Sequence, residues 1–514
     1  MQSPWHTLQP YPEFPLFHFL ETAAAGPSDR PALLTPDGER WTFGQVCDGA
    51  RRVAQMLRPY VGRGDRVLFL APNSPAYATA VYGAMMAGGT AVPLNPLLKP
   101  DELRRIAADV EPAVAFVAGG AQALVESLRP ELPSLRSVFD LGTLWSDLEG
   151  VPARADSVPL DAREDLAALP FSSGTTGLPK GVMLSHFNLV ANVRQTLATG
   201  MTPPYNTLLN YMPFFHVYGF ASLMGMAFAL GVPQVIVSRF DPELILRLAA
   251  LHEVHTLYAP PPALRALVAA RRAGGQATPS VRAIVTGAAP TPLDLAREAA
   301  EAFGVAVAQP YGLSEATAAT NMNPFHRIKP VTVGPPLPDT EEKIVDPETG
   351  AEQRTGSVGE VWIRGPQVMR GYWRQPEATA ACLMPDGWLR TGDLGKLDED
   401  GYLQIVDRLK DMIRYKGHQV APFELESVLL EHPAVADVCV IPRPDVDAGE
   451  VPKACVVLEP GAAATAEALM AFVAERVNPM SRIRDVEFID AIPRNPSGKV
   501  LRRELIERER ARTA

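Results

Sequence analysis

Short apolar runs alternate with helical patterns across residues 31–150. The apolar runs are continuous, as in strands that are buried on both faces, and the segments between them repeat apolar positions at helical spacing. This alternation predicts βαβ units around a parallel sheet. We expect strands at residues 66–71, 90–94 and 113–117, and helices at residues 77–87 and 103–108.

Residues 207–330 repeat this alternation, and the pattern then changes twice. From about residue 331, short strand-like runs separated by turns predict a small β-barrel-like subdomain, and the rest of the chain predicts an α+β unit. The expected strands of residues 207–330 are 234–237, 256–258, 283–286 and 305–308, with a helix at 242–251. Those of the small subdomain are 342–345, 359–364, 388–390 and 402–406. The last unit has expected helices at 422–431 and 466–477 and strands at 435–441, 454–458 and 485–488.

The predicted fold class is therefore α/β. A large N-terminal domain, residues 1–406, consists of two βαβ-type subdomains and the small β-barrel-like subdomain, and a smaller α+β C-terminal domain covers residues 407–514. A chain of 514 residues is long enough for more than one domain.

Composition and charge restrict the classes of function. The chain has 48 basic and 58 acidic residues and a net charge of −10, which argues against nucleic-acid binding because such proteins carry a basic footprint. Its cysteines, Cys47, Cys382, Cys439 and Cys455, form no Cys-x-x-Cys pair and no metal-ligand spacing with histidine. We therefore expect neither structural zinc nor a disulfide framework.

The sequence predicts a cytoplasmic protein without a transmembrane segment. Residues 1–19 are rich in proline and lack the basic segment and apolar core of a signal peptide. The most apolar stretch, residues 223–237, is interrupted by Gly225, Gly231 and Pro233. It falls short of the ~20 apolar residues that a membrane span needs.

One stretch, Ser172-Ser-Gly-Thr-Thr-Gly-Leu-Pro-Lys-Gly181, is rich in glycine and hydroxyl residues. Glycines let backbone N–H groups turn toward an anion and hydroxyls add donors, so the stretch suits a polyphosphate. A flexible linker is the alternative, but the stretch lies between apolar runs. It does not match the P-loop pattern, because Gly174 and Gly177 are three apart and Gly181 follows Lys180.

The same stretch resembles the phosphate-loop signature of the adenylate-forming superfamily, which includes acyl-CoA synthetases, peptide-synthetase adenylation domains and luciferases. Further segments match other motifs of the family, in the family's order, over nearly the whole chain. The match is close to acyl-CoA synthetases and 4-coumarate–CoA ligase-like, AMP-dependent ligases.

His216 lies in the aromatic segment Tyr211-Met-Pro-Phe-Phe-His-Val-Tyr-Gly219. A lone histidine in such a setting is usually a satisfied core residue. The segment resembles the acyl-pocket motif of acyl-CoA synthetases, which places His216 beside the substrate carboxylate and later beside the incoming thiol. The segment Thr286-Gly-Ala-Ala-Pro290 resembles the turn that the family packs against adenine and the acyl chain.

Two acidic residues are candidates for holding Mg·ATP. Glu315, beside Ser314 and just past an expected strand, suits Mg²⁺ held through one carboxylate and substrate phosphates. In the family the matching tyrosine, Tyr311, stacks on adenine, and a threonine usually stands where this chain has Ser314. Asp393 lies in a predicted Gly-bounded loop and suits the two ribose hydroxyls. The alternative is a turn aspartate that caps its own backbone.

Residues 407–417 resemble the hinge of the family and the loop after it. The resemblance implies a hinge at residues 408–410, where rotation about Lys410 moves the C-terminal domain. Arg414 stands where closer relatives have lysine, and a guanidinium is not equivalent to an ammonium. Near the end of the chain, the turn of residues 492–500 projects Lys499, which in the family bridges the carboxylate and the α-phosphate.

The site residues that the resemblance implies fall into four sets. The catalytic set is Lys499, His216, Lys410 and Glu315, and the Mg²⁺ set is Glu315 and Thr176. The ATP- and AMP-binding set is Ser172, Ser173, Gly174, Thr175, Thr176, Lys180, Gly287, Ala288, Gln309, Tyr311, Gly312, Ser314, Asp393, Arg408, Gln419 and Lys499. The acyl-binding set is Tyr218, Gly219 and Ala289, and the CoA-binding set is Arg239, Lys416 and Gly417.

The implied reaction uses ATP, Mg²⁺ and coenzyme A. A carboxylic acid forms acyl-AMP with release of pyrophosphate, and the acyl group then passes to CoA. A medium- or long-chain fatty acid is expected, because Phe214, Phe215, Tyr218, Phe220 and Met224 predict an apolar pocket and no residue pairs with a second substrate charge. An aryl acid such as 4-coumarate is the alternative substrate. Transfer to a carrier protein and a luciferase-like oxidation are alternative activities. We expect a monomer or homodimer.

Overall fold

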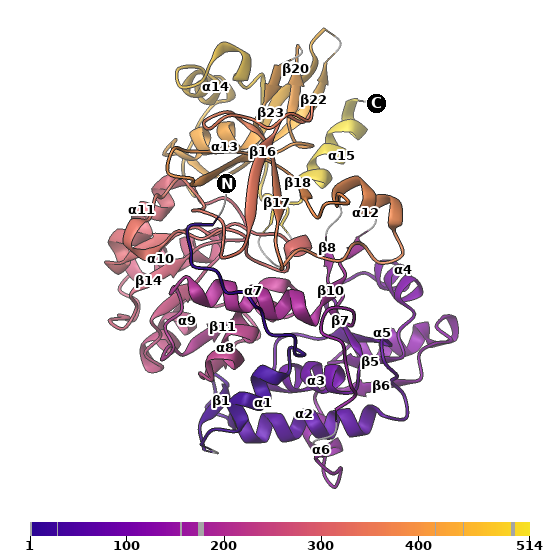
Figure 1. Cartoon of the computed structure of the whole chain (residues 1–514). Helices are drawn as coiled ribbons and strands as arrows, with labels where there is room; N and C mark the ends of the chain where they lie inside the picture. Colours follow the sequence, from indigo (N-terminus) through magenta and orange to yellow (C-terminus); the bar gives the residue numbers. More distant parts are fainter. Residues whose placement is uncertain are drawn as a thin grey trace.

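The chain forms a large body and a smaller unit above it in the view of Figure 1. This computed structural model describes residues 3–27, 29–154, 157–172, 179–416, 418–445, 447–494 and 499–513. The N-terminal elements lie at the lower end of the large body, and the elements after residue 410 form the upper unit (Figure 1). No helix in these ranges is long and apolar enough to cross a membrane.

A six-stranded sheet, in the order β10-β7-β4-β3-β5-β6, organises the first part of the chain. All neighbouring pairs are parallel except β10 with β7. Its strands are β3 (Arg66–Leu70), β4 (Thr90–Pro93), β5 (Val114–Val117), β6 (Ser137–Asp140), β7 (Leu166–Ala168) and β10 (Leu184–Ser185). The associated helices are α2 (Phe43–Leu57), α3 (Pro75–Met86), α4 (Pro100–Val110), α5 (Ala121–Leu128), α6 (Leu144–Asp147) and α7 (His186–Ala198). The parallel sheet confirms the predicted βαβ pattern.

The second part of the chain builds two sheets. One is β11 (Leu208–Asn210), β12 (Gln234–Ile236), β1 (Pro31–Leu34) and β2 (Arg40–Thr42), and the other is β13 (Thr256–Tyr258), β14 (Ala283–Val285) and β15 (Ala306–Ala308). The accompanying helices are α1 (His18–Ala24), α8 (Gly225–Leu230), α9 (Pro242–Leu251), α10 (Pro261–Arg272) and α11 (Leu293–Phe303). β1 pairs with β12, so the start of the chain completes the second subdomain. The division of the sequence into consecutive subdomains did not anticipate this pairing.

An antiparallel meander follows, in the order β16-β17-β18-β19. Its strands are β16 (Glu341–Val345), β17 (Gly359–Arg364), β18 (Leu389–Leu397) and β19 (Leu403–Arg408), with α12 (Pro376–Cys382) before β18. β18 runs through Asp393, so the predicted Gly-bounded loop at this aspartate is wrong: Asp393 is a strand residue.

The last unit has the sheet order β21-β20-β23-β22, with β24 on β23. Its strands are β20 (Ile413–Tyr415), β21 (His418–Val420), β22 (Val435–Asp445), β23 (Gly449–Leu458) and β24 (Asp485–Phe488). Its helices are α13 (Pro422–Leu430), α14 (Ala466–Ala474) and α15 (Arg502–Thr513). This unit has a core of its own around Leu425, Val440 and Leu469. The domain boundary at residues 406/407 stays a prediction.

Close packing of α3 on α2 supports the core under the six-stranded sheet. Every residue of α3 is buried, and Gly83 lies against Ala50 and Val53 of α2. A Cβ at Gly83 would come within 2.6 Å of the Ala50 carbonyl oxygen, a backbone atom that cannot rotate away.

We expect Gly83→Ala to lower the stability of the fold by roughly 1–3 kcal/mol, because overpacking a close helix contact outweighs the helix preference of alanine. The matched control is Gly120→Ala. Gly120 has a φ of −62° and no heavy atom within 4 Å of the new Cβ, so this change should be neutral or slightly stabilising. Thermal unfolding of both variants checks the prediction, and equal shifts would contradict it.

Candidate active site

A cavity of about 950 Å³ lies where the last unit meets the large body. It brings together predicted site residues from the large body and from the last unit. These are Ser172, Lys180, His216, Tyr218, Gly287, Ala288, Tyr311, Gly312, Ser314, Glu315, Asp393, Arg408, Lys410, Gln419 and Lys499. Five others are described by the structure but do not line it: Gly219, Ala289, Gln309, Arg239 and Lys416. Ser173, Gly174, Thr175, Thr176 and Gly417 lie outside the described residues.

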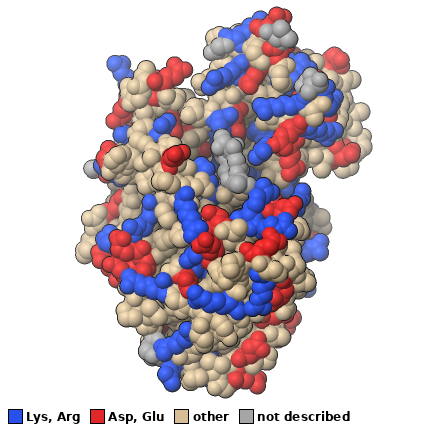
Figure 2. All heavy atoms as spheres, turned by 90° about the vertical axis from the view of Figure 1, so that its right-hand side faces the viewer, with Lys and Arg blue, Asp and Glu red and all other residues tan. Residues whose placement is uncertain are grey.

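The two ends of the predicted phosphate loop are joined at the cavity wall. Strands β8 (Phe171–Ser172) and β9 (Lys180–Gly181) pair, with Ser172 opposite Lys180. Both residues line the cavity. Across the face shown in Figure 2, basic and acidic side chains are interspersed.

Glu315 is one of the carboxylates that line the cavity. It lies on a short 3₁₀ helix, and its Oε1 accepts a hydrogen bond of 2.9 Å from the Tyr372 hydroxyl. In the described part of the chain, no cluster of three or more His, Cys, Asp or Glu could hold a metal ion by itself. A single carboxylate in a polyphosphate-sized cavity fits Mg²⁺, which keeps several waters and uses substrate phosphates as ligands.

Asp393 is held from two sides by residues of the same cavity. Its Oδ2 accepts a bond of 2.5 Å from the Tyr311 hydroxyl, and Arg408 Nε lies 3.3 Å from its Oδ1. Asp393 and Arg408 are cross-strand partners on β18 and β19. Burial raises the pKa of Asp393, and the Arg408 charge opposes this rise. A fixed carboxylate at this position can accept the hydroxyls of a ribose.

Several motif glycines are required by backbone packing. A Cβ on Gly312 would lie 1.6 Å from the Ala318 carbonyl oxygen, and a Cβ on Gly219 would lie 2.4 Å from that of Met212. Gly219 is therefore a packing residue behind the acyl wall. Gln309, another residue outside the lining, accepts the Thr291 N–H at 3.0 Å through its side-chain oxygen and so holds the turn that follows β14.

His216 and Tyr218 line the cavity together with apolar residues such as Val217 and Val285. His216 Nδ1 accepts the Tyr218 N–H at 3.3 Å, so the imidazole proton of the neutral form is on Nε2. Burial, together with the charge of Lys499, lowers the pKa of His216 to about 4. At neutral pH this histidine is an uncharged hydrogen-bond donor.

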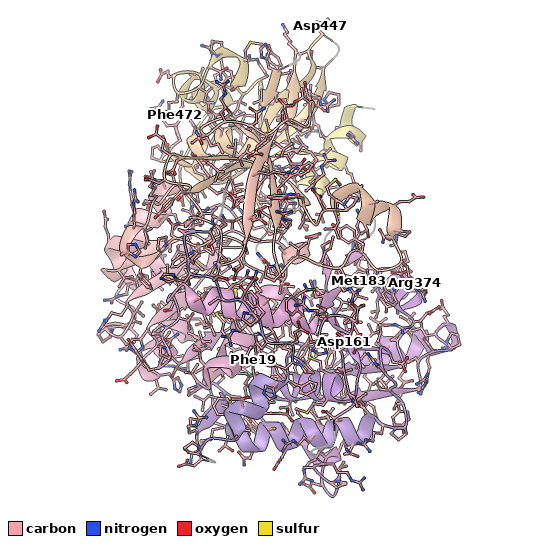
Figure 3. All side chains as sticks on the ribbon, viewed as in Figure 1. Phe19, Asp161, Met183, Arg374, Asp447 and Phe472 are labelled. Carbon is pink, nitrogen blue, oxygen red and sulfur yellow. The ribbon has the colours of Figure 1, made fainter. Side chains whose placement is uncertain are left out.

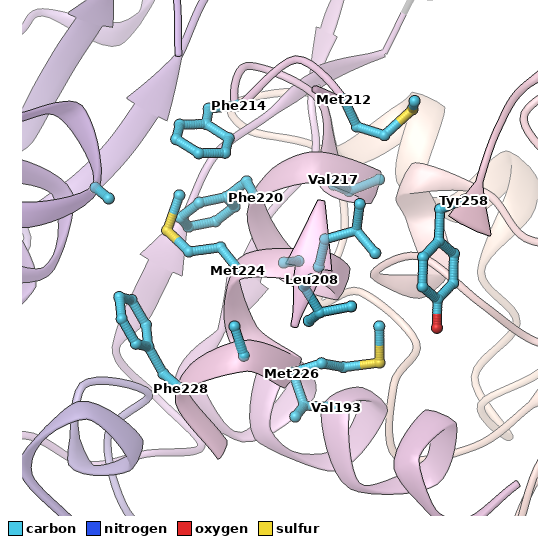
Figure 4. Packing of buried hydrophobic residues seen from close by; sticks show 14 of the residues in the cluster. Val193, Leu208, Met212, Phe214, Val217, Phe220, Met224, Met226, Phe228 and Tyr258 are labelled. Carbon is cyan, nitrogen blue, oxygen red and sulfur yellow. The ribbon is translucent and has the colours of Figure 1, made fainter. Parts of the chain in front are cut away.

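Of the residues expected to form the acyl pocket, two line the cavity and three do not. Phe215 and Tyr218 line the cavity, whereas Phe214, Phe220 and Met224 are fully buried in the core, as Figure 4 shows. Residues Tyr218–Met224 form a π-helix, which winds more widely than an α-helix. The sequence pattern did not reveal this winding, and Tyr218 and Ser222 of the segment both line the cavity.

Lys499 lines the cavity, and described residues on either side of it in the sequence are held by ion pairs. Arg494 forms a two-fold contact with Asp437 at 2.8 and 2.9 Å and bridges to Val500, and Arg502 contacts Glu426 at 2.8 Å. Burial, and then the charges of Arg408 and Lys410, lower the pKa of Lys499 to about 8. The pKa of Lys410 is also lowered to about 8, mainly by burial.

Sequence reasoning missed several residues of the cavity wall. Tyr372 hydrogen-bonds Glu315, and buried Glu360 accepts the N–H of Gly392, which has a φ of +71° beside Asp393. Both follow glycine in turn-rich segments, and nothing in their spacing marks them as site residues. Only the fold brings them to the cavity.

Comparisons with known proteins agree with this geometry. The model of the AMP-binding enzyme family matches residues 19–373, and that of the AMP-binding enzyme C-terminal domain matches residues 424–499. The chain belongs to the AMP-binding enzyme family. It is thus a member of the adenylate-forming superfamily, with the large N-terminal and small C-terminal domains of those ligases.

Relatives cover most of the chain. A 4-coumarate–CoA ligase-like protein from Oryza sativa is 38% identical over 511 residues, 95% of this chain and 91% of the relative. A peroxisomal OPC-8:0-CoA ligase from Arabidopsis thaliana is 35% identical over 490 residues, 91% of this chain and 89% of the relative.

The solved structures also inform the arrangement of the two units. ATP-bound MatB from Rhodopseudomonas palustris has a TM-score of 0.89 at 28% identity, and apo MatB has 0.78 at 29%; both matches cover 96% of this chain and 99% of the other. The whole-chain arrangement is therefore nearer to the ATP-bound form. This agrees with the position of Lys499 inside the cavity.

The lowered pKa of Lys499 predicts a falling alkaline limb in acyl-AMP formation. The ammonium loses its proton, and with it the attraction for phosphate, as the pH rises through about 8, so kcat/KM for ATP should fall there. Lys410→Met removes one like charge and should move this limb to higher pH. ATP–pyrophosphate exchange between pH 6 and 10 measures it. A limb that persists unchanged in Lys499→Arg would assign the titration to another group.

Proposed function

We propose that this protein converts a fatty acid, ATP and CoA into acyl-CoA, AMP and pyrophosphate, with medium-chain acids preferred to long ones. At the coarser level the chain is an AMP-forming acid–CoA ligase of its family. The observation that carries the proposal is one cavity in which Lys499 of the last unit joins His216, Glu315 and Asp393 of the large body.

The apolar part of the cavity wall favours an apolar substrate. Residues Val217, Val285, Leu313, Ala319 and Met322 form it together with Phe215 and Tyr218. None of these carries a charge that would pair with an amino group or a second carboxylate. Phe214, Phe220 and Met224 pack in the core instead of lining the cavity, and the smaller apolar wall favours a medium chain.

The first half-reaction joins a carboxylate oxygen of the acid to the α-phosphorus of ATP, and pyrophosphate leaves. Lys499 places its ammonium among the phosphoryl oxygens, His216 donates from Nε2 to the carboxylate, and Asp393 holds the ribose. Mg²⁺, which Glu315 and substrate phosphates would hold, supplies charge neutralisation on the phosphates. These groups act by positioning and electrostatics, as phosphoryl transfer generally requires.

In the second half-reaction the CoA sulfur attacks the acyl carbonyl, and the C–O bond to AMP breaks. We infer that the C-terminal domain rotates about Lys410 beforehand, withdrawing Lys499 and bringing the residues around Lys416 and Gln419 toward the cavity. The CoA contacts of Arg239, Lys416 and Gly417, the hinge at residues 408–410, the cytoplasmic location and the monomeric or dimeric state stay predictions.

An aryl acid is the second candidate substrate. Tyr218 and Tyr258 both line the cavity, with ring centroids 6.3 Å apart at 82°, so they form a compact aromatic wall. Aromatic rings favour such edge-to-face partners. The name of the rice relative points the same way.

Lys499→Ala should abolish acyl-AMP formation, with a loss of at least ~100-fold as for removal of a charged stabilising group, and should largely spare thioester formation from supplied acyl-AMP. The control is Lys396→Ala, because Lys396 is on the same strand as Asp393 but does not line the cavity. The two half-reactions are measured separately, by ATP–pyrophosphate exchange and by consumption of CoA thiol. An equal loss in both would contradict the assigned role of Lys499.

The substrate is tested by AMP release with ATP, Mg²⁺ and CoA across C2–C18 fatty acids, benzoate, cinnamate and 4-coumarate. We expect a maximum among medium-chain acids. A preference for aryl acids would overturn the fatty-acid assignment. AMP release without a thioester product would instead indicate a carrier protein as acceptor.

A further inference from the structure

Tyr372 lines the same cavity as Ser172, Lys180 and Glu315, where the phosphates of ATP are expected. Its segment is held by backbone hydrogen bonds. Residues 370–373 run beside 181–183: Arg370 N–H donates to Met183 O at 3.0 Å, Met183 N–H to Gly371 O at 2.9 Å, and Trp373 N–H to Gly181 O at 2.8 Å. Figure 3 shows the neighbouring Met183 and Arg374 close together at this edge of the molecule. The backbone of Tyr372 is thereby fixed against β9.

The side chain of Tyr372 contacts both Glu315 and Lys180. Its hydroxyl donates to Glu315 Oε1 at 2.9 Å, and Lys180 Nζ lies 4.8 Å from the centre of its ring. Its own N–H donates to Thr379 Oγ1 at 2.9 Å, which restrains the residue from behind. One aromatic ring therefore orients a carboxylate and an ammonium at the same time.

The chemistry of these contacts suits a nucleotide triphosphate with its cation. A tyrosine hydroxyl is protonated at neutral pH, and that of Tyr372 donates to the Glu315 carboxylate. A bond to Oε1 fixes the rotation of the carboxylate and leaves Oε2 for a cation. The cation–π contact restrains the Lys180 ammonium at the cavity wall.

We propose that Tyr372 is a positioning residue: it orients Glu315 to bind Mg²⁺ and Lys180 to bind the phosphates of ATP. This inference rests on the proposed function, because it assumes that ATP occupies the cavity. The hydroxyl acts through Glu315 and the ring acts through Lys180, so the two effects are separable by substitution.

Tyr372→Phe removes the hydroxyl alone. We expect ATP affinity to fall about 10-fold in the presence of Mg²⁺ and to stay within about 2-fold in EDTA. The variant loses the hydrogen bond to Glu315 in both conditions, but Glu315 contributes to ATP binding only when it has a cation to hold. Tyr372→Leu also removes the ring and should weaken ATP binding in EDTA too. Calorimetric titration of the full chain with ATP, without an acid substrate, gives these affinities in the absence of turnover.

Tyr402→Phe is the matched control. The Tyr402 ring lies 4.4 Å from Lys329 Nζ, and its hydroxyl donates to the Arg327 backbone carbonyl at 2.9 Å. It therefore makes the same two kinds of contact as Tyr372, with a carbonyl in place of a carboxylate, but it does not line the cavity. Its loss should leave ATP affinity unchanged. Thermal unfolding of both phenylalanine variants checks that the fold is kept.

A double-variant cycle separates positioning from simple packing. In a Glu315→Gln background, Tyr372→Phe should cause no further loss of Mg²⁺-dependent affinity, because the two residues act as one unit. Additive losses, equal losses with and without Mg²⁺, or behaviour identical to Tyr402→Phe would each overturn the inference. If the wild-type protein bound no ATP, the proposed function itself would fail.

Discussion

The pairing of Asp393 with Arg408 is the interaction on which the site depends. A buried carboxylate is costly unless it is paired and hydrogen-bonded, and here β18 and β19 place an arginine directly opposite it. Arg408 is also the last residue of β19, where the expected hinge begins. Arg408, which compensates the buried charge of Asp393, is therefore also the residue at which the chain leaves the large body for the unit that carries Lys499.

Like charges are gathered in the same place. Arg408, Lys410 and Lys499 line one cavity, and their mutual repulsion contributes to the lowered pKa of both lysines. Such an arrangement is unfavourable without an anion and becomes favourable when a polyphosphate enters. A bound polyphosphate would therefore both gain from these three cations and favour the position of Lys499 inside the cavity.

Much of the fold was predictable because local signals agreed with the long-range structure. The helix at 242–251 was predicted with its correct bounds, since Pro242 follows Asp241, whose side chain caps the Leu244 N–H. The pairing of β1 with β12 was not, because hydrophobic pattern does not report which distant strands are neighbours. Asp393 was misplaced in a loop because Thr391-Gly392-Asp393 has the composition of a turn, while the pairing with β19 extends the strand through it.

The candidate site shows the same division. Motif matching found the charged and aromatic groups of the cavity, but it could not distinguish ligand contacts from packing requirements, as Gly219 shows. Tyr372 and Glu360 escaped it because they act on other residues.

The π-helix of Tyr218–Met224 has a further consequence for how the acid pocket can change. A π-helix is related to an α-helix by one additional residue in the turn. Deleting one residue of this segment would let the turn close to α-helical winding while the following helix α8 keeps its register, so the change in which side chains face the cavity would be confined to Tyr218–Met224. Substrate range at this wall is therefore open to alteration by change of chain length, in one step that no single substitution reproduces.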